Sequence, residues 1–168
     1  MQIHELFAAQ LEREAAVSRR VLARVPAGHD DWKPHEKSMA FGYLATLVAT
    51  VPSWVERMVA RDELDLNPPG GASFRPPQWR TAEELAALHE GCVAGALAAL
   101  RGTTDARLDG RWRLLVAGRV VDENPRHVFV ADALTHLAHH RGQLTVYLRL
   151  LGVPVPSVYG PSADDKTF

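Results

Sequence analysis

Two histidines near the C-terminal end, His136 and His140, carry the chemistry that is most readily read from this chain. They lie in an apolar-periodic segment from about Arg126 to Leu151, and this periodicity predicts a helix. Residues four apart on a helix lie one turn above each other, with Cβ atoms about 5–6 Å apart. Two imidazoles in that arrangement can share one divalent cation, or they can hydrogen-bond without any metal. The spacing alone leaves both interpretations open.

Three further polar side chains fall on the same helical stripe: Asp132, Gln143 and Tyr147. An apolar seam of valine and leucine runs beside this stripe, so we expect the stripe to border the core and face a cavity between helices. Asp132 lies one turn before His136, where a carboxylate is a potential third ligand. Ligands spread over eight residues of a straight helix span about 12 Å, however, which is too far for one ion. The alternative role for Asp132 is a hydrogen bond to the His136 ring.

Composition restricts the classes of function. The chain has 168 residues, a net charge of −1, 46% hydrophobic residues and 23% charged residues, which predicts a single globular domain over residues 1–168. No basic patch indicates nucleic acid or an anionic membrane as a partner. No apolar run approaches 18 residues and no signal peptide is apparent, so we expect no membrane span and a cytoplasmic location. The single cysteine, Cys92, excludes an internal disulfide.

Four helical segments are expected to position the histidines, and they are listed here by residue number: 2–25, 38–61, 81–102 and 124–152. Ser38, Thr81 and Asn124 are the expected N-caps, and Thr81 with Glu84 fits a capping box. Pro52 should either kink the second helix or end its first half near Thr50. These segments predict an all-α fold, an antiparallel four-helix bundle with short accessory elements.

The remaining segments are the expected accessory elements and connections. Residues 112–121 alternate around a glycine and could form a short hairpin. Residues 65–80 are rich in proline and glycine and predict an ordered surface loop. The tail, residues 153–168, is expected to be extended.

Three stretches of the sequence resemble one known family. The stretch from His136 to Asp164, HLAHHRGQLTVYLRLLGVPVPSVYGPSAD, looks like the C-terminal signature of the DinB/YfiT-like family of metalloenzymes. The segments RVP at 24–26 and DWKPHEKSM at 31–39 are similar to that family's first interhelical loop. Pro52-Ser53-Trp54 is similar to its Pro-Gly-Trp segment. Together these matches cover most of the chain in the family's order.

The resemblance implies a divalent metal, such as zinc or nickel, bound by three histidines. His136 and His140 match the pair on the last helix. The third ligand is expected on the second helix, five residues after Gly42 and seven before Trp54, and both counts arrive at Leu47. The third histidine is therefore missing from this chain, and two imidazoles alone would favour copper or nickel by the general affinity order.

Two functional hypotheses follow. In the first, the resemblance implies a metal-dependent transferase or hydrolase, and some members of the superfamily use thiols such as bacillithiol or mycothiol. Gln143 and Tyr147 would then orient the substrate. In the second, the chain is a metal-free member whose pocket, lined by Leu47, binds a small molecule, or whose surface serves as an interaction site in a stress response. The family resemblance also suggests a homodimer.

Overall fold

The computed structural model describes residues 2–71, 77–79 and 81–167. Within that part, the elements in chain order are α1 (Ile3–Leu22), α2 (Phe41–Thr50), α3 (Pro52–Ala60), β1 (Glu63–Asp65), α4 (Ala82–Arg101), α5 (Asp105–Asp109), β2 (Arg111–Val116), β3 (Arg119–Pro125) and α6 (Arg126–Leu150). The predicted surface loop at 65–80 lies partly outside the described residues.

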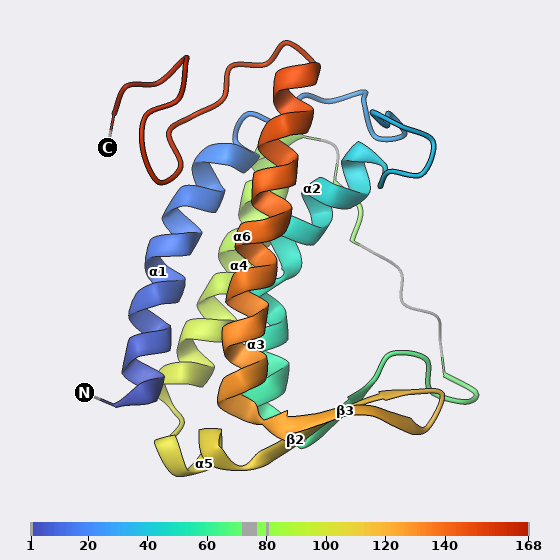
Figure 1. Cartoon of the computed structure of the whole chain (residues 1–168), viewed down its shortest axis with the longest axis vertical. Coiled ribbons are helices and arrows are strands. Elements are labelled where there is room, and N and C mark those ends of the chain that lie inside the picture. The colour runs from blue at the N-terminus through green and yellow to red at the C-terminus, as the bar shows by residue number, and fades with distance from the viewer. Residues whose placement is uncertain (1, 72–76, 80, 168) are drawn as a thin grey trace.

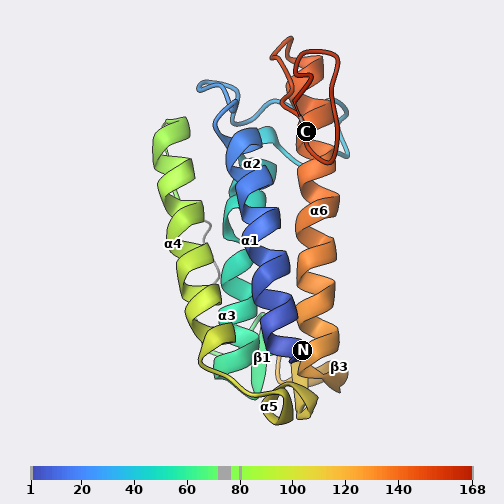
Figure 2. The same cartoon turned by 90° about the vertical axis from the view of Figure 1, so that its left-hand side faces the viewer.

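The long helices run alongside one another, and a small sheet lies at one end of them (Figure 1). Helices α1 and α6 run in one direction, while the α2–α3 pair and α4 run in the other; Figure 2 shows the same arrangement from the side. Helices α3 and α4 therefore run parallel to each other, both toward the end of the molecule that holds the sheet (Figure 1).

The expectation of an all-α four-helix bundle is wrong. The described residues contain six helices and a three-stranded mixed sheet in the order β1-β2-β3. Strand β1 pairs in parallel with β2, and β2 pairs antiparallel with β3. Strand β1 could not be predicted from the sequence, because a strand of three residues has no measurable period and depends on a partner about 50 residues away.

The predicted hairpin is confirmed and is more tightly built than its sequence suggests. Val116 pairs with Arg119 across a two-residue turn in which Ala117 and Gly118 both have positive φ, 51° and 76°. Two such residues in a row are typical of a type I′ turn, whose twist suits a hairpin. The Asp65 carboxylate at the end of β1 accepts hydrogen bonds from the backbone N–H groups of both turn residues, at 3.0 and 2.7 Å. The parallel strand and the hairpin are therefore held together at the turn.

The break in the second predicted helix is confirmed at its expected place. Helix α2 ends at Thr50 and α3 begins at Pro52, which has no N–H to continue the hydrogen-bond ladder. The predicted start at Ser38 is wrong, because α2 begins at Phe41 and its N-cap, Ala40, makes no side-chain hydrogen bond. The backbone N–H of Ser38 instead donates to His35 O in a turn.

The start of α6 also differs from the prediction. Asn124 and Pro125 are the last residues of β3, and the helix begins at Arg126. The buried Arg126 side chain donates to Met58 O at 3.0 Å and Arg61 O at 3.3 Å, two carbonyls at the end of α3. It thereby satisfies carbonyls that a helix C-terminus leaves without backbone partners. This contact fixes the beginning of α6 against the end of α3, beside the sheet.

The third predicted helix forms as α4. The Thr81 hydroxyl accepts a hydrogen bond from the Glu84 backbone N–H at 3.2 Å, which confirms Thr81 as the N-cap. Gly102 is the C-cap, as expected.

Candidate functional site

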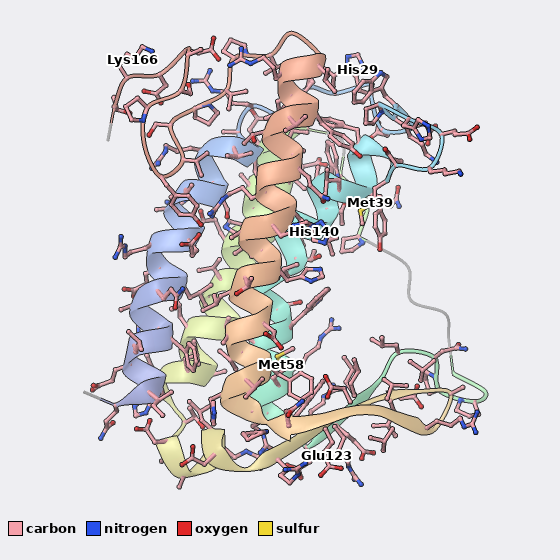
Figure 3. All side chains as sticks on the ribbon, viewed as in Figure 1. His29, Met39, Met58, Glu123, His140 and Lys166 are labelled. Carbon is pink, nitrogen blue, oxygen red and sulfur yellow. The ribbon has the colours of Figure 1, made fainter. Side chains whose placement is uncertain are left out.

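A pocket of about 520 Å³ is lined by residues of α2, α3, α6 and the sheet. Its walls are mainly apolar and aromatic, and the lining residues are Tyr43, Thr46, Leu47, Thr50, Trp54, Arg57, Met58, Leu64, Leu66, Trp112, Leu114, Phe129, Asp132, Ala133 and His136. Figure 3 shows His140 about midway along α6 and Met58 on α3, closer to the sheet. The lining runs from the first turn of α2, which carries Tyr43, to β1 and β2, which carry Leu64 and Trp112.

The two histidines contact each other directly. The His136 and His140 Nε2 atoms lie 2.9 Å apart, and His140 Nδ1 lies 2.7 Å from Gln143 Oε1. Because the amide oxygen can only accept, His140 Nδ1–H donates to it, and His140 Nε2 is left to accept from His136 Nε2–H. His140 is buried, whereas His136 is half-buried and lines the pocket. Gln143 therefore sets the tautomers of both rings.

Both histidines are held in the neutral form. Burial is the main cause that lowers the pKa of His136, and repulsion from the His140 and His139 rings when these are protonated lowers it further. Burial also lowers the pKa of His140 and outweighs the hydrogen bond to Gln143, which raises it. The Trp54 ring lies against His136, with ring centroids 5.0 Å apart, and contributes to this burial. At neutral pH the pair therefore presents hydrogen-bonding groups without charge to the pocket.

A three-ligand metal centre does not fit the residues present. Two nitrogens bound to one ion at about 2.0–2.1 Å lie roughly 2.9–3.4 Å apart, so the spacing of the histidine pair suits two ligands. Among the described residues, however, no group of three or more His, Cys, Asp or Glu side chains could hold a metal ion. Leu47, where the family resemblance places the third histidine, is half-buried and lines the pocket with its isobutyl group.

The other residues predicted for the site lie in different surroundings. Asp132 lines the pocket and is exposed. Gln143 contacts His140 rather than the pocket. Tyr147 packs edge-on against Trp32, with centroids 5.6 Å apart, and its hydroxyl donates to Met39 O at 3.3 Å. Tyr147 lies eleven residues beyond His136, or about 16 Å along the helix axis, so sharing a stripe does not place both in one pocket.

Much of the pocket wall was not anticipated from the sequence. Trp112, Leu114 and Leu64 come from the sheet, and Arg57 comes from the far side of the Pro52 break. The alternation of Trp112 and Leu114 on one face of the predicted hairpin was an available signal, because residues two apart on a strand share a face. Nothing in the sequence indicated that this face would reach the histidine helix.

Comparison with known proteins assigns the family. The model of the DinB family matches residues 1–167, so the chain belongs to the DinB family. A DinB-like protein from Bacillus cereus ATCC 10987 has a similar fold, with a TM-score of 0.69 and 21% identity over 92% of this chain and 97% of that one. The DinB-like protein YjoA from Bacillus subtilis aligns with a TM-score of 0.64 and 20% identity, over 89% of this chain and 96% of that one. At such identities the likeness concerns the fold.

A shorter match is to the uncharacterized protein YrdA of Bacillus subtilis (strain 168). It is 47% identical over 32 residues, which span 19% of this chain and 19% of YrdA. Within the described residues, no helix is long and apolar enough to cross a membrane.

Proposed function

We propose that this DinB-family protein binds a small, largely apolar organic molecule in the pocket lined by α2, α3, α6 and the sheet, without a catalytic metal. The observation that carries the proposal is the pocket itself, at about 520 Å³ with aromatic and aliphatic walls and with Leu47 in place of a third metal ligand. Ligand pockets of drug-sized molecules typically have this size range, apolar walls and a few polar groups that fix orientation.

The polar groups on the pocket wall support selective binding. Thr46 and Thr50 use their hydroxyl protons within α2, on Gly42 O and Thr46 O, both at 2.9 Å. His136 gives one ring nitrogen to His140 and retains the other, Nδ1, whose lone pair is available to a ligand donor. A neutral imidazole beside the Trp54 ring is suited to a hydroxyl or amine on an aromatic ligand.

The second candidate is a metal-dependent, thiol-using transferase or hydrolase, and the 2.9 Å spacing of the two Nε2 atoms favours it. A divalent ion bound there would lower the pKa of a water or thiol bound to it. His140 is prepared for such a role, because Gln143 fixes its Nδ1–H and leaves Nε2 unprotonated.

Metal content and ligand binding separate the two candidates. Untagged protein purified without chelators is analysed for zinc, nickel and copper, beside a His136→Ala/His140→Ala variant and a His139→Ala control. Benzyl alcohol is then titrated while tryptophan fluorescence is followed, since two tryptophans line the pocket. We expect metal well below one equivalent in every protein and saturable binding of the probe.

The pocket is tested with Leu47→Trp, which narrows it, and with Val146→Trp as a control on the exposed surface of α6. We expect the first substitution alone to weaken probe binding while both variants stay folded by circular dichroism. Near one equivalent of metal, lost with the histidine pair, would overturn the proposal in favour of the enzyme. Absence of saturable binding would overturn it as well. Homodimer formation, a role in a stress response and a cytoplasmic location stay predictions.

A further inference from the structure

Two charged side chains line this mainly apolar pocket, and they come from different helices. Arg57 lies on α3 and is half-buried, while Asp132 lies on α6 and is exposed. Within the described part of the chain, neither side chain forms an ion pair or a hydrogen bond, and the two do not pair with each other. A guanidinium has five donors and a carboxylate about four acceptor sites, so both groups retain their full hydrogen-bonding capacity.

The rest of the pocket cannot neutralise these groups. The hydroxyls of Thr46 and Thr50 already donate within α2, and Thr46 also accepts from Trp79 Nε1 at 2.8 Å. His136 is neutral, and its Nε2–H donates to His140 Nε2. A bound ligand therefore meets an unpaired cation and an unpaired anion on a wall that otherwise carries no charge.

We propose that the natural ligand is a small amphipathic zwitterion, with an anionic group held by Arg57, a cationic group held by Asp132 and an apolar, preferably aromatic, body against the rings of the pocket. This inference rests on the proposed binding function and specifies its ligand class. Arg57 suits a carboxylate, because its planar fork can donate two parallel hydrogen bonds. Asp132 suits an amine, and Trp54, Trp112 and Phe129 supply aromatic surface. Opposite charges at separate points of the wall also fix the orientation of the ligand.

Four probes of similar size test the charge requirement: benzyl alcohol (neutral), 3-phenylpropionate (anion), 2-phenylethylamine (cation) and 4-(aminomethyl)benzoate (zwitterion). Their dissociation constants are measured by calorimetry at 50 mM and 500 mM NaCl. We expect the zwitterion to bind most tightly and benzyl alcohol most weakly. The advantage of the charged probes should shrink at high salt, since partly exposed charges are screened.

Two substitutions separate the charges. Arg57→Gln should weaken binding of the anion and the zwitterion by on the order of three- to tenfold, which is typical for partly exposed ion pairs. Binding of benzyl alcohol should not change. Asp132→Asn should weaken binding of the cation and the zwitterion to a similar extent and strengthen binding of the anion. Arg57→Lys, which keeps the charge, should retain most of the affinity. Arg61→Gln and Glu36→Gln are matched controls at exposed positions outside the pocket and should change nothing.

The outcomes distinguish the two proposals. If benzyl alcohol binds but the charged probes bind no better, or if Arg57→Gln and Asp132→Asn leave all affinities unchanged, the zwitterion is excluded and the binding function stands. If none of the four probes binds, the binding function fails and the inference about its ligand fails with it.

Discussion

His140 and Arg141 are consecutive residues of α6, yet they belong to two polar clusters on different sides of the helix. His140 turns toward His136 and Gln143, at the edge of the pocket. Arg141 turns toward α1, where it donates to Glu14 O, Ser18 Oγ and the Glu14 carboxylate at 3.0, 3.1 and 2.6 Å. A rotation of about 100° per residue separates the two environments.

The two clusters differ in how much of their hydrogen-bonding capacity the fold consumes. The Arg141 side chain is fully buried, and one terminal nitrogen also donates to the Tyr159 hydroxyl in the tail, so that only its Nε lacks a partner among the described residues. This cluster joins α1, α6 and the tail. The histidine pair keeps a free lone pair at His136 and faces a cavity. The first arrangement is typical of a group that stabilises a fold, and the second of a group that binds something else.

The substitution with the largest expected effect removes the buried guanidinium of Arg141. Arg141→Met should lower the free energy of unfolding by about 3 kcal/mol, because it leaves the Glu14 carboxylate, whose side chain is only 14% exposed, without its cation. Urea denaturation measures the loss. The exposed pair of Arg19 and Glu90 is the control, and Arg19→Gln should cost less than about 1 kcal/mol. Equal effects of the two substitutions would contradict the assignment of Arg141 as a stabilising group.

The next prediction tests whether a third imidazole turns the pair of His136 and His140 into a metal site. Leu47→His places a third imidazole where the family resemblance expects one, beside a pair already spaced for chelation. We expect zinc affinity to rise more than about a hundredfold, or about 2.7 kcal/mol, over the parent chain. Competition with a chromophoric chelator measures the affinity, and Leu47→Gln controls for loss of the isobutyl group. An affinity no higher than that of the parent would show that Leu47 does not occupy the ligand position.

The sequence predicted what depends on local order. Helical periodicity predicted the helix that carries the histidines, and the missing N–H of Pro52 predicted the break before it. Turn and capping residues within a few positions predicted the hairpin and the Thr81 N-cap. The start of α6 was misplaced because Asn124-Pro125 satisfies the local rules for a helix start. Instead, Asn124 pairs with Trp112 and Pro125 with Arg111 across the sheet. Pro125 still ends the strand, since it has no N–H for a further ladder bond.

The candidate site was predicted on one wall only. Helical periodicity identified the face of α6 that carries His136 and Asp132, and the structure places both on the pocket. Periodicity could not identify the part of the wall that comes from β1 and β2, because β1 pairs with a partner distant in sequence. It also could not separate Tyr147 from His136, because a helical stripe specifies an angle around the axis and not the length of the cavity beside it.

A buried histidine on α4, His89, makes the stability of the fold depend on pH. His89 is fully buried, with Nδ1 3.2 Å from Ala49 O and Nε2 3.4 Å from Ala15 O. Burial is the main cause that lowers its pKa, against smaller opposing contributions from the two carbonyls. A folded-state pKa below the unfolded value of 6.5 means that the unfolded chain takes up the proton first as pH falls. His89 therefore stabilises the fold above pH 6.5, and this stability is lost as pH falls below 6.5 toward the folded-state pKa.

The loss from His89 between pH 6.5 and 5 is at most about 2 kcal/mol, since each pH unit is worth about 1.4 kcal/mol per proton. Urea denaturation at pH 7 and pH 5 measures it. The decrease should be smaller in His89→Gln than in the parent chain, whereas His35→Gln, in an exposed loop, should follow the parent. Parallel decreases in all three proteins would assign the acid sensitivity to other groups.

The smallest expected effect concerns the tail. The Tyr159 hydroxyl donates to Glu14 Oε2 at 2.9 Å and accepts from Arg141, whose guanidinium lies 5.1 Å from the centre of the Tyr159 ring. Tyr159→Phe keeps the ring contact and removes only the hydroxyl, so it should lower the free energy of unfolding by about 1 kcal/mol. Benzyl alcohol binding should not change, because the hydroxyl belongs to the α1 side of α6. A change in probe affinity as large as the change in stability would show that the two clusters are coupled through α6.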